Sequence, residues 1–190
     1  MQSFLFFCRS VALSLLMLTL AGPGAQASAQ PAGDPAYERA LDQFNRARKG
    51  DADPLDAAIA AFQAAPANPA LKPLYAAYLG SARTLQGKAA WLPWKKLKLT
   101  DQGLDQIDQA LAALRPEHDQ VLVHGAPVSL ATRLVAAATF IAVPDGLFHR
   151  RAAGKSVLAE IRRSSFLTST PSGFRAELDA VEARLKEAEK

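Results

Sequence analysis

The spacing of the apolar residues is the feature that most limits what this chain can fold into. In three segments, apolar residues recur at intervals of three and four. Such spacing places them on one side of an α-helix. No segment shows the alternation typical of a half-buried strand, so the sequence predicts an all-α protein. The three sets are Tyr37, Ala40, Leu41 and Phe44; Leu55, Ala58, Ile59 and Phe62; and Phe174, Leu178, Val181 and Leu185.

Three helix starts are marked by a capping residue followed by proline. Asp53, Asn68 and Thr170 each precede a proline. The cap accepts a hydrogen bond from a free backbone N–H, and proline has no N–H to leave unsatisfied. The loops between helices are short, which favours antiparallel neighbours. The predicted helices cover residues 35–49, 54–65, 69–86, 100–115, 127–143, 148–164 and 171–188.

Residues 1–29 have the composition of a secretory signal peptide. Arg9 precedes an apolar run over residues 11–20, and small residues that include Ala27 and Ala29 follow. The run is shorter than the roughly 20 residues of a membrane span, and the small residues are typical of a cleavage site. We therefore expect cleavage near Ala27 or Ala29, a short linker over residues 30–34, and a periplasmic or secreted mature protein. An uncleaved membrane anchor is the alternative.

The mature chain is predicted to lack cysteine and to carry little net charge. Cys8, the single cysteine, lies in the signal peptide, so cleavage excludes disulfides and cysteine-ligated metals. Basic residues number 22 and acidic residues 18, an excess too small to indicate a nucleic-acid partner. Roughly 160 residues remain after cleavage, enough for one domain with an ordinary core. We place this single helical domain at residues 35–190.

Paired helices prompt a search for repeats of about 34 residues. Residues 78–87 resemble the first helix of a tetratricopeptide repeat (TPR), with Gly80 and Gly87 at the family's glycine separation. Small residues at these positions let two helix axes approach closely. The resemblance extends over about residues 35–165. Sets that resemble the second helix are Ala58, Phe62, Ala65 and Pro69; Gly103, Ile107, Ala110 and Pro116; and, more loosely, Ala152, Ser156 and Ala159.

The resemblance implies a short TPR-like solenoid of two to three helical hairpins with a C-terminal capping helix; an unrelated helical bundle is the alternative. TPR stacks hold a peptide or a partner helix in a concave groove lined by their first helices. This lining is small and weakly polar here, and it lacks the lysine and asparagine clamp with which some members bind a peptide carboxylate. The residues at the groove positions are Leu74, Ala77, Ser81, Thr84 and Leu85.

Residues 88–99 depart from the TPR pattern. Where the family has a tight turn, this chain carries the additional residues AAWLPWKKLKL, which we interpret as an insertion at a corner between two helices. In one interpretation the tryptophans fold back and seal an apolar surface. In the other the insertion is an exposed binding loop that contacts an acidic partner or an anionic membrane. The residues of this candidate site are Trp91, Trp94, Lys95, Lys96 and Lys98.

No catalytic motif is present in the sequence. His118, His124 and His149 are not spaced as a helical metal pair, and neither a phosphate-binding loop nor a nucleophile elbow occurs. We therefore predict a protein that is not an enzyme and has no cofactor or metal.

The sequence predicts a non-catalytic scaffold or adaptor that binds a protein or peptide partner, as in an envelope assembly or transport system. The alternative is a peripheral module that docks on a membrane surface through the tryptophan and lysine insertion. The apolar stripe of the last helix also permits self-association. Packing of that stripe on the last repeat is the alternative.

Overall fold

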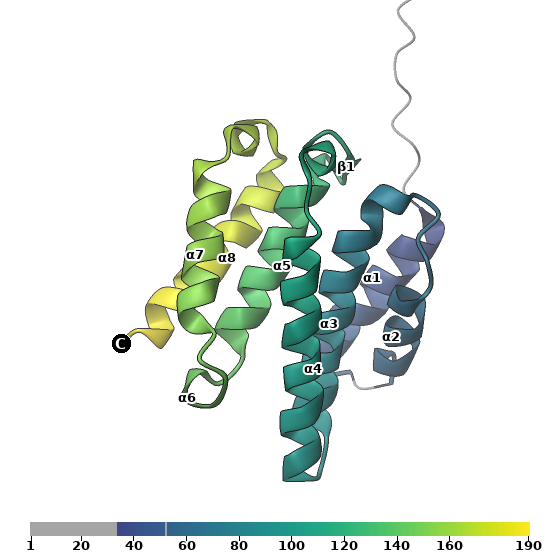
Figure 1. Cartoon of the computed structure of the whole chain (residues 1–190), viewed down its shortest axis with the longest axis vertical. Coiled ribbons are helices and arrows are strands. Elements are labelled where there is room, and N and C mark those ends of the chain that lie inside the picture. The colour runs from purple at the N-terminus through teal and green to yellow at the C-terminus, as the bar shows by residue number, and fades with distance from the viewer. Residues whose placement is uncertain (1–33, 52) are drawn as a thin grey trace, which may run out of the picture. The chain divides into compact units, whose positions relative to one another are not determined.

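The computed structural model describes residues 34–51 and 53–190, so the predicted signal peptide and most of the linker lie outside the described residues. This part is mostly helical, which confirms the all-α prediction (Figure 1). The α-helices are α1 (Pro35–Arg48), α2 (Leu55–Gln63), α3 (Lys72–Ala89), α4 (Pro93–Ala112), α5 (Val128–Ala142), α6 (Asp145–Phe148), α7 (Arg151–Arg163) and α8 (Ser172–Ala188). The shorter elements are the 3₁₀ helices η1 (Pro69–Leu71), η2 (Pro116–Asp119) and η3 (Ser165–Ser169), and the strands β1 (Leu122–Val123) and β2 (Ala126–Pro127).

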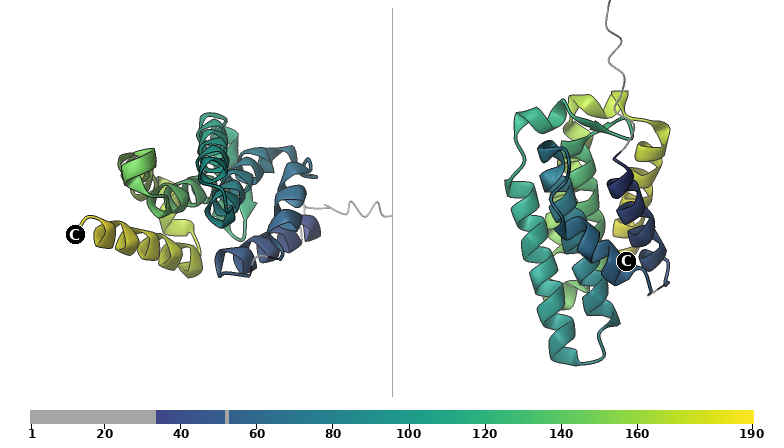
Figure 2. Two further views of the ribbon diagram at one scale, coloured as in Figure 1. Left: turned by 90° about the horizontal axis from the view of Figure 1, so that it is seen from below. Right: turned by 90° about the vertical axis from the view of Figure 1, so that its right-hand side faces the viewer.

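The helices pack on one another largely in chain order. α1 packs on α2, α3 on α4, and α5 on α7, and α8 then covers α5 and α7. Between these pairs, α3 contacts both α1 and α5. Viewed along the helices, α1 and α8 flank the same side of α3 and α5 (Figure 2). Successive helices thus surround a space that opens between the first helix and the last.

Two apolar clusters form the core. The first joins α1, α2 and α3 around a set of aromatic rings, and the second joins α4, α5, α7 and α8. Burying one large apolar side chain contributes about 1.5–3 kcal/mol, so both clusters stabilise the fold strongly. The aromatic rings are those of Tyr37, Phe44, Phe62, Tyr75 and Tyr78. Fully buried residues of the second cluster include Leu104, Ile107, Phe140, Ile161 and Leu178.

The predicted start of a helix at residue 100 is wrong, because α4 begins seven residues earlier, at Pro93. Proline suits the first turn of a helix, and the lysine and leucine residues that follow it are good helix formers. Thr100 is buried against α3, where a Cβ on Gly87 would lie 2.5 Å from Thr100 Oγ1. Residues 88–99 therefore lengthen both helices of the α3–α4 hairpin, and only residues 90–92 connect them.

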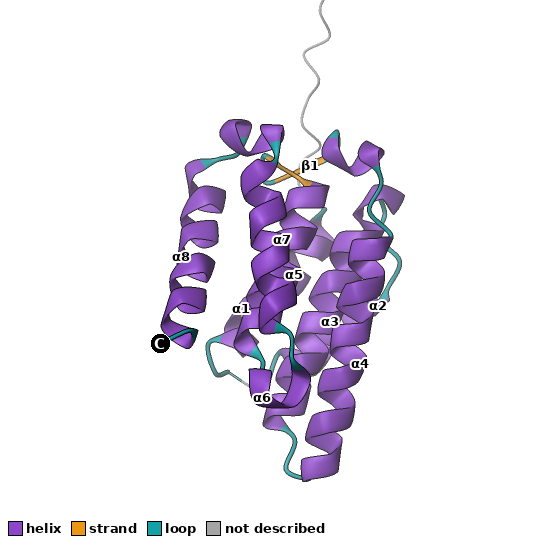
Figure 3. Cartoon of the chain, turned by 60° about the vertical axis from the view of Figure 1, so that its left-hand side comes forward, coloured by secondary structure: helices purple, strands orange, loops and turns teal. Residues whose placement is uncertain are grey.

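Other boundaries differ from the predictions for local reasons. The expected helix over residues 148–164 is broken at His149, whose φ of 53° ends α6. A two-residue turn at His124 and Gly125, both with positive φ, joins β1 to β2 in a small antiparallel hairpin that the sequence analysis did not predict (orange in Figure 3). Asn68 caps η1 as predicted. The side chain of Thr170 instead bonds to the Leu167 carbonyl.

The C-terminal stripe is occupied within the chain. Leu178, Val181 and Leu185 are buried in the second cluster, and Phe174 packs against its edge. The residues of α7 that loosely resemble a TPR second helix are exposed; they are Ala152, Ser156 and Ala159. Gly154 is instead the small residue of α7 that packs closely on α5. Within the described ranges, no helix has the length and apolar character needed to cross a membrane.

Candidate functional site

A groove of about 1170 Å³ lies between α1, α3, α5 and α8. We call it the groove throughout. The small β-hairpin closes it near the start of α5, and α6 lines it near the end of α5. Its apolar lining includes Leu41, Phe44, Leu85, Leu134, Val135, Ala138, Phe148 and Phe174.

The groove lining includes the buried hydroxyl groups of Ser81, Thr84 and Thr139. The Oγ atoms of Ser81 on α3 and Thr139 on α5 lie 2.9 Å apart and are hydrogen-bonded. The Thr84 hydroxyl donates to the Ser81 carbonyl at 2.8 Å. Because these hydroxyl groups form their hydrogen bonds within the protein, the groove lining here consists of small side chains that are only weakly polar. An apolar occupant can lie on such a surface without leaving a buried polar group unpaired.

One end of the groove is lined by basic side chains from four separate segments. Lys49 follows α1, Lys88 is near the end of α3, Lys96 is in the first turn of α4, and Arg184 is near the end of α8. The acidic residues of the groove lining are Asp42 and Glu177. This basic end attracts a negatively charged group on whatever occupies the groove.

An ion pair joins the first helix to the last across the groove. The Arg48 guanidinium lies 3.6 Å from a Glu177 carboxylate oxygen, and both side chains are about half exposed. An exposed pair of this kind contributes at most about 1 kcal/mol. It therefore spans the open side of the groove without preventing the two helices from separating.

The structure divides the groove residues predicted from the TPR resemblance into two groups. Ser81, Thr84 and Leu85 line the groove. Leu74 and Ala77 are fully buried in the core, which corrects their assignment as lining residues. The first turns of α3 are covered by α1 and α2, so the helix reaches the groove only from Tyr78 onward.

The end of the α3–α4 hairpin carries both tryptophans on its surface. Trp91 is 88% exposed, Trp94 is 64% exposed and Leu97 is 44% exposed. These values overturn the interpretation that the tryptophans seal an apolar surface. We call residues 88–98 the tip, and it extends beyond the neighbouring helices (Figure 1). Lys95 and Lys98 are also exposed there.

The tip and the groove are adjacent, because Lys88, Lys96 and Leu97 belong to both. The two sets of candidate residues, which the sequence analysis treated as separate, thus meet at the basic end of the groove. This convergence depends on the length of the α3–α4 hairpin and on where α8 ends, which the sequence pattern did not reveal.

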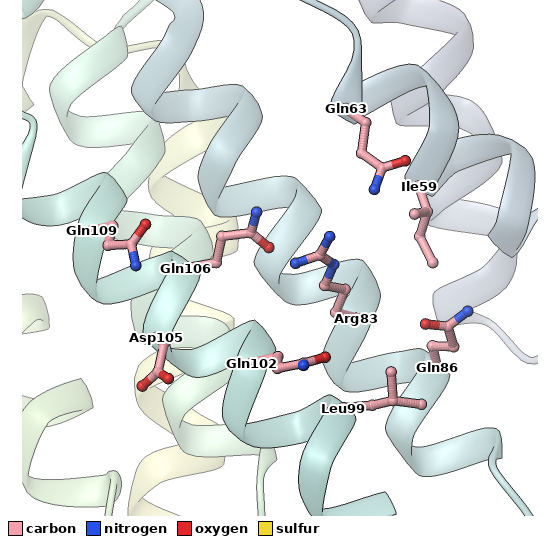
Figure 4. A pocket seen from close by; sticks show the side chains of 9 residues that line it. All are labelled: Ile59, Gln63, Arg83, Gln86, Leu99, Gln102, Asp105, Gln106 and Gln109. Atoms are coloured by element: carbon pink, nitrogen blue, oxygen red, sulfur yellow. The ribbon is translucent and has the colours of Figure 1, made fainter. Parts of the chain in front are cut away.

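A second hollow, of about 570 Å³, lies on a different face of α3, and we call it the outer pocket. Side chains from α2, α3 and α4 point into it (Figure 4). This pocket was not predicted from the sequence, although Gln102, Gln106 and Gln109 recur at helical spacing and so lie on one face of α4. The lining residues are Ile59, Gln63, Arg83, Gln86, Leu99, Gln102, Asp105, Gln106 and Gln109.

Comparison with known proteins gives no further guide to the site. No protein-family model, curated protein or solved structure matches this chain. Its function must therefore be argued from the groove, the tip and the outer pocket themselves.

Two of the three histidines have structural partners. The Arg115 N–H donates to His118 Nδ1 at 2.8 Å, and His124 Nε2 lies 2.6 Å from a Glu38 carboxylate oxygen. Across residues 34–51 and 53–190, no three His, Cys, Asp or Glu side chains are grouped to hold a metal ion. The first contact caps the start of η2, and the second ties the β-hairpin to α1.

Proposed function

We propose that this protein is a non-catalytic adaptor of TPR-like architecture whose groove holds an apolar segment of a protein or peptide partner. The groove between α1, α3, α5 and α8 is the observation that carries the proposal. Support for the architecture comes from the pairing of successive helices and from the small residues Gly80 and Gly103 at the α3–α4 crossing. Stacked helical pairs bury a continuous core and present one curved face to a partner.

The dimensions and charges of the groove define the segment that fits it. A helix about 10–12 Å wide that rises 1.5 Å per residue fills the groove volume with roughly two turns. Its apolar side chains would contact Leu85, Val135 and Ala138. An acidic group at one end would face the basic side chains around Lys88 and Lys96. The occupant is therefore a short amphipathic helix with an acidic end.

A peptide-binding measurement tests this proposal. We would measure fluorescence anisotropy of labelled leucine–alanine helical peptides, one ending in glutamates and a second ending in lysines. We expect the peptide that ends in glutamates to bind more tightly than the one that ends in lysines. We expect Ala138→Trp, which fills the groove, to lower the affinity for the acidic peptide at least tenfold. Ala152→Trp is the matched control, because Ala152 is exposed on α7. Equal affinity for the Ala138→Trp and Ala152→Trp proteins, or no binding of either peptide, would refute the proposal.

The tip supports a second candidate function, docking on an anionic membrane surface. The observation that favours it is the exposure of Trp91 and Trp94 next to four lysines, with no acidic residue between Asp56 and Asp101. Tryptophan partitions to the membrane interface, and each lysine near an anionic surface contributes about 1 kcal/mol. The tip shares only Lys88, Lys96 and Leu97 with the groove, so most of the groove lining lies outside this docking surface.

Vesicle sedimentation tests the second candidate. We expect the mature protein to sediment with phosphatidylglycerol vesicles and not with phosphatidylcholine vesicles. The double change Trp91→Ala and Trp94→Ala should abolish sedimentation with phosphatidylglycerol. Leu122→Ala is the control, since Leu122 is exposed in the β-hairpin, away from the tip. Binding that is equal for both lipids, or that survives loss of both tryptophans, would exclude docking through the tip.

A further inference from the structure

The outer pocket gathers most of the glutamine side chains of the described chain. Five of the seven glutamines in residues 34–51 and 53–190 line it, and Gln43 and Gln120 are the two outside. The five come from three helices: Gln63 from α2, Gln86 from α3, and the others from α4. A solvated helix surface more often carries lysine and glutamate. This concentration of carboxamides is therefore a feature of the pocket rather than of the surface as a whole.

Two polar side chains of the outer pocket, Gln106 and Arg83, have groups without a partner among the described residues. Gln106 Oε1 is buried and has no hydrogen-bond partner among the described residues. Arg83 is half-buried and forms no ion pair with an acidic side chain in the described part of the chain. One carboxamide is paired, as Gln86 Nε2 donates to Asp56 at 3.3 Å. A buried polar atom without a partner destabilises the protein, and a polar ligand that bonds to it would remove that cost.

The arrangement of these groups defines the chemistry of the ligand. In Figure 4 the guanidinium of Arg83 lies among the carboxamides of Gln63, Gln86, Gln102 and Gln106, while Asp105 points away from them. A guanidinium binds a carboxylate through two parallel hydrogen bonds. A carboxamide both donates and accepts, as a hydroxyl group does, so the surrounding glutamines suit hydroxyl groups next to that carboxylate.

We propose that the outer pocket binds a small hydrophilic carboxylate, of the class of hydroxy acids and sugar acids. The carboxylate pairs with Arg83, and the hydroxyl groups exchange hydrogen bonds with the glutamines, including buried Gln106 Oε1. The volume of about 570 Å³ falls within the range of small-molecule pockets, about 300–1,000 Å³. This site lies apart from the groove and the tip, so it does not depend on the proposed function.

Side-chain amide NMR signals test the proposal directly. In a ¹H–¹⁵N spectrum each glutamine NH₂ group gives its own pair of peaks, which single glutamine-to-alanine variants assign. We would titrate the mature protein with sodium gluconate, with glucose as the uncharged counterpart, and with propionate as the carboxylate without hydroxyl groups. We expect gluconate to shift the peaks of Gln63, Gln86, Gln102 and Gln106 at concentrations where glucose and propionate do not. The peaks of Gln43 and Gln120 should stay in place.

Two variants and one further ligand complete the test. Arg83→Gln removes the charge and keeps hydrogen-bonding capacity, and we expect at least a tenfold loss of gluconate affinity. Arg83→Lys keeps the charge without the two-pronged geometry, and we expect an intermediate loss. Unchanged backbone peaks would show that both variants are folded. No shift of the pocket glutamines with gluconate, an unchanged affinity in Arg83→Gln, or tighter binding of N-acetylalanine than of gluconate would each overturn the proposal.

Discussion

Gly80 and Gly103 face each other at the point where α3 crosses α4. A Cβ built on Gly80 would lie 2.5 Å from the Gly103 carbonyl oxygen and 2.7 Å from Ile107 Cγ1. The two backbones are thus in direct contact, closer than any pair of side chains would permit. This contact sets the spacing of α3 and α4, whose opposite faces form the groove and the outer pocket.

Replacing Gly80 by alanine should destabilise the protein. Alanine favours a helix by about 1 kcal/mol over glycine, but overpacking a close contact costs about 1–3 kcal/mol or more when backbone atoms must move. We expect a net loss of about 1–2 kcal/mol in urea denaturation. Gly173→Ala is the matched control, because no atom lies within 4 Å of a Cβ at that helical position. A Gly80→Ala protein as stable as Gly173→Ala would contradict the close contact.

Both tryptophans should report an aqueous environment in the free protein. Trp91 and Trp94 are the only tryptophans of the chain, and both are mostly exposed. We expect a red emission maximum and efficient acrylamide quenching. Because neither indole packs in the core, the double alanine variant should lose no more than about 0.5 kcal/mol of unfolding free energy. A blue-shifted, poorly quenched emission of the free protein would place the indoles against an apolar surface.

The three tyrosines should make the fold sensitive to alkaline pH. Burial raises the pKa of Tyr78 to about 12; burial, followed by the negative charge of Asp34, raises the pKa of Tyr75 to about 12. Burial also raises the pKa of Tyr37 well above its ordinary value. The unfolded pKa is about 10. Folding therefore favours the neutral phenols. The contribution of the neutral phenols to the free energy of unfolding is complete below a pH of about 10, and it is lost as the pH rises toward 12.

Tyrosinate absorbance and far-ultraviolet circular dichroism, recorded across this pH range, check the tyrosine prediction. Tyr37, Tyr75 and Tyr78 are the only tyrosines of the chain, so the absorbance reports this cluster alone. We expect both signals to change together above pH 10. Ionisation of all three phenols near pH 10 with the helices retained would show that the rings are accessible to water.

Arg162 should contribute more to stability than the other surface ion pairs. It joins α7 to α8 through Glu182 at 2.7 Å and Asp179 at 2.5 Å, and these hydrogen bonds, first the one to Glu182, raise the pKa of Arg162 further. Two partners hold one partly exposed guanidinium, so we expect Arg162→Met to cost about 0.5–1 kcal/mol, reduced by salt. Lys155→Met, which breaks the single pair with Glu189, is the control. Equal effects of the two changes in thermal denaturation would contradict the prediction.

The sequence predicted the helices well and their assembly only in part. Periodic apolar residues located the helices because each helix needs one apolar face, whatever it packs against. The boundary of α4 was missed because Pro93 was read as part of a loop, although proline also begins helices. The break at His149 depends on a single left-handed residue that no apolar pattern records.

The candidate sites, like the fold, could be predicted from the sequence only in part. Local sequence accounts for the all-α class, for the small residues Gly80 and Gly103, and for the concentration of tryptophan and lysine in one segment, because each depends only on residues near one another in the chain. The tertiary structure decided that the tryptophans are exposed and that Arg48 meets Glu177. It also decided that glutamines from three helices surround Arg83. Such relationships join residues distant in sequence, and they are set by how closely the helices pack and how far each one extends.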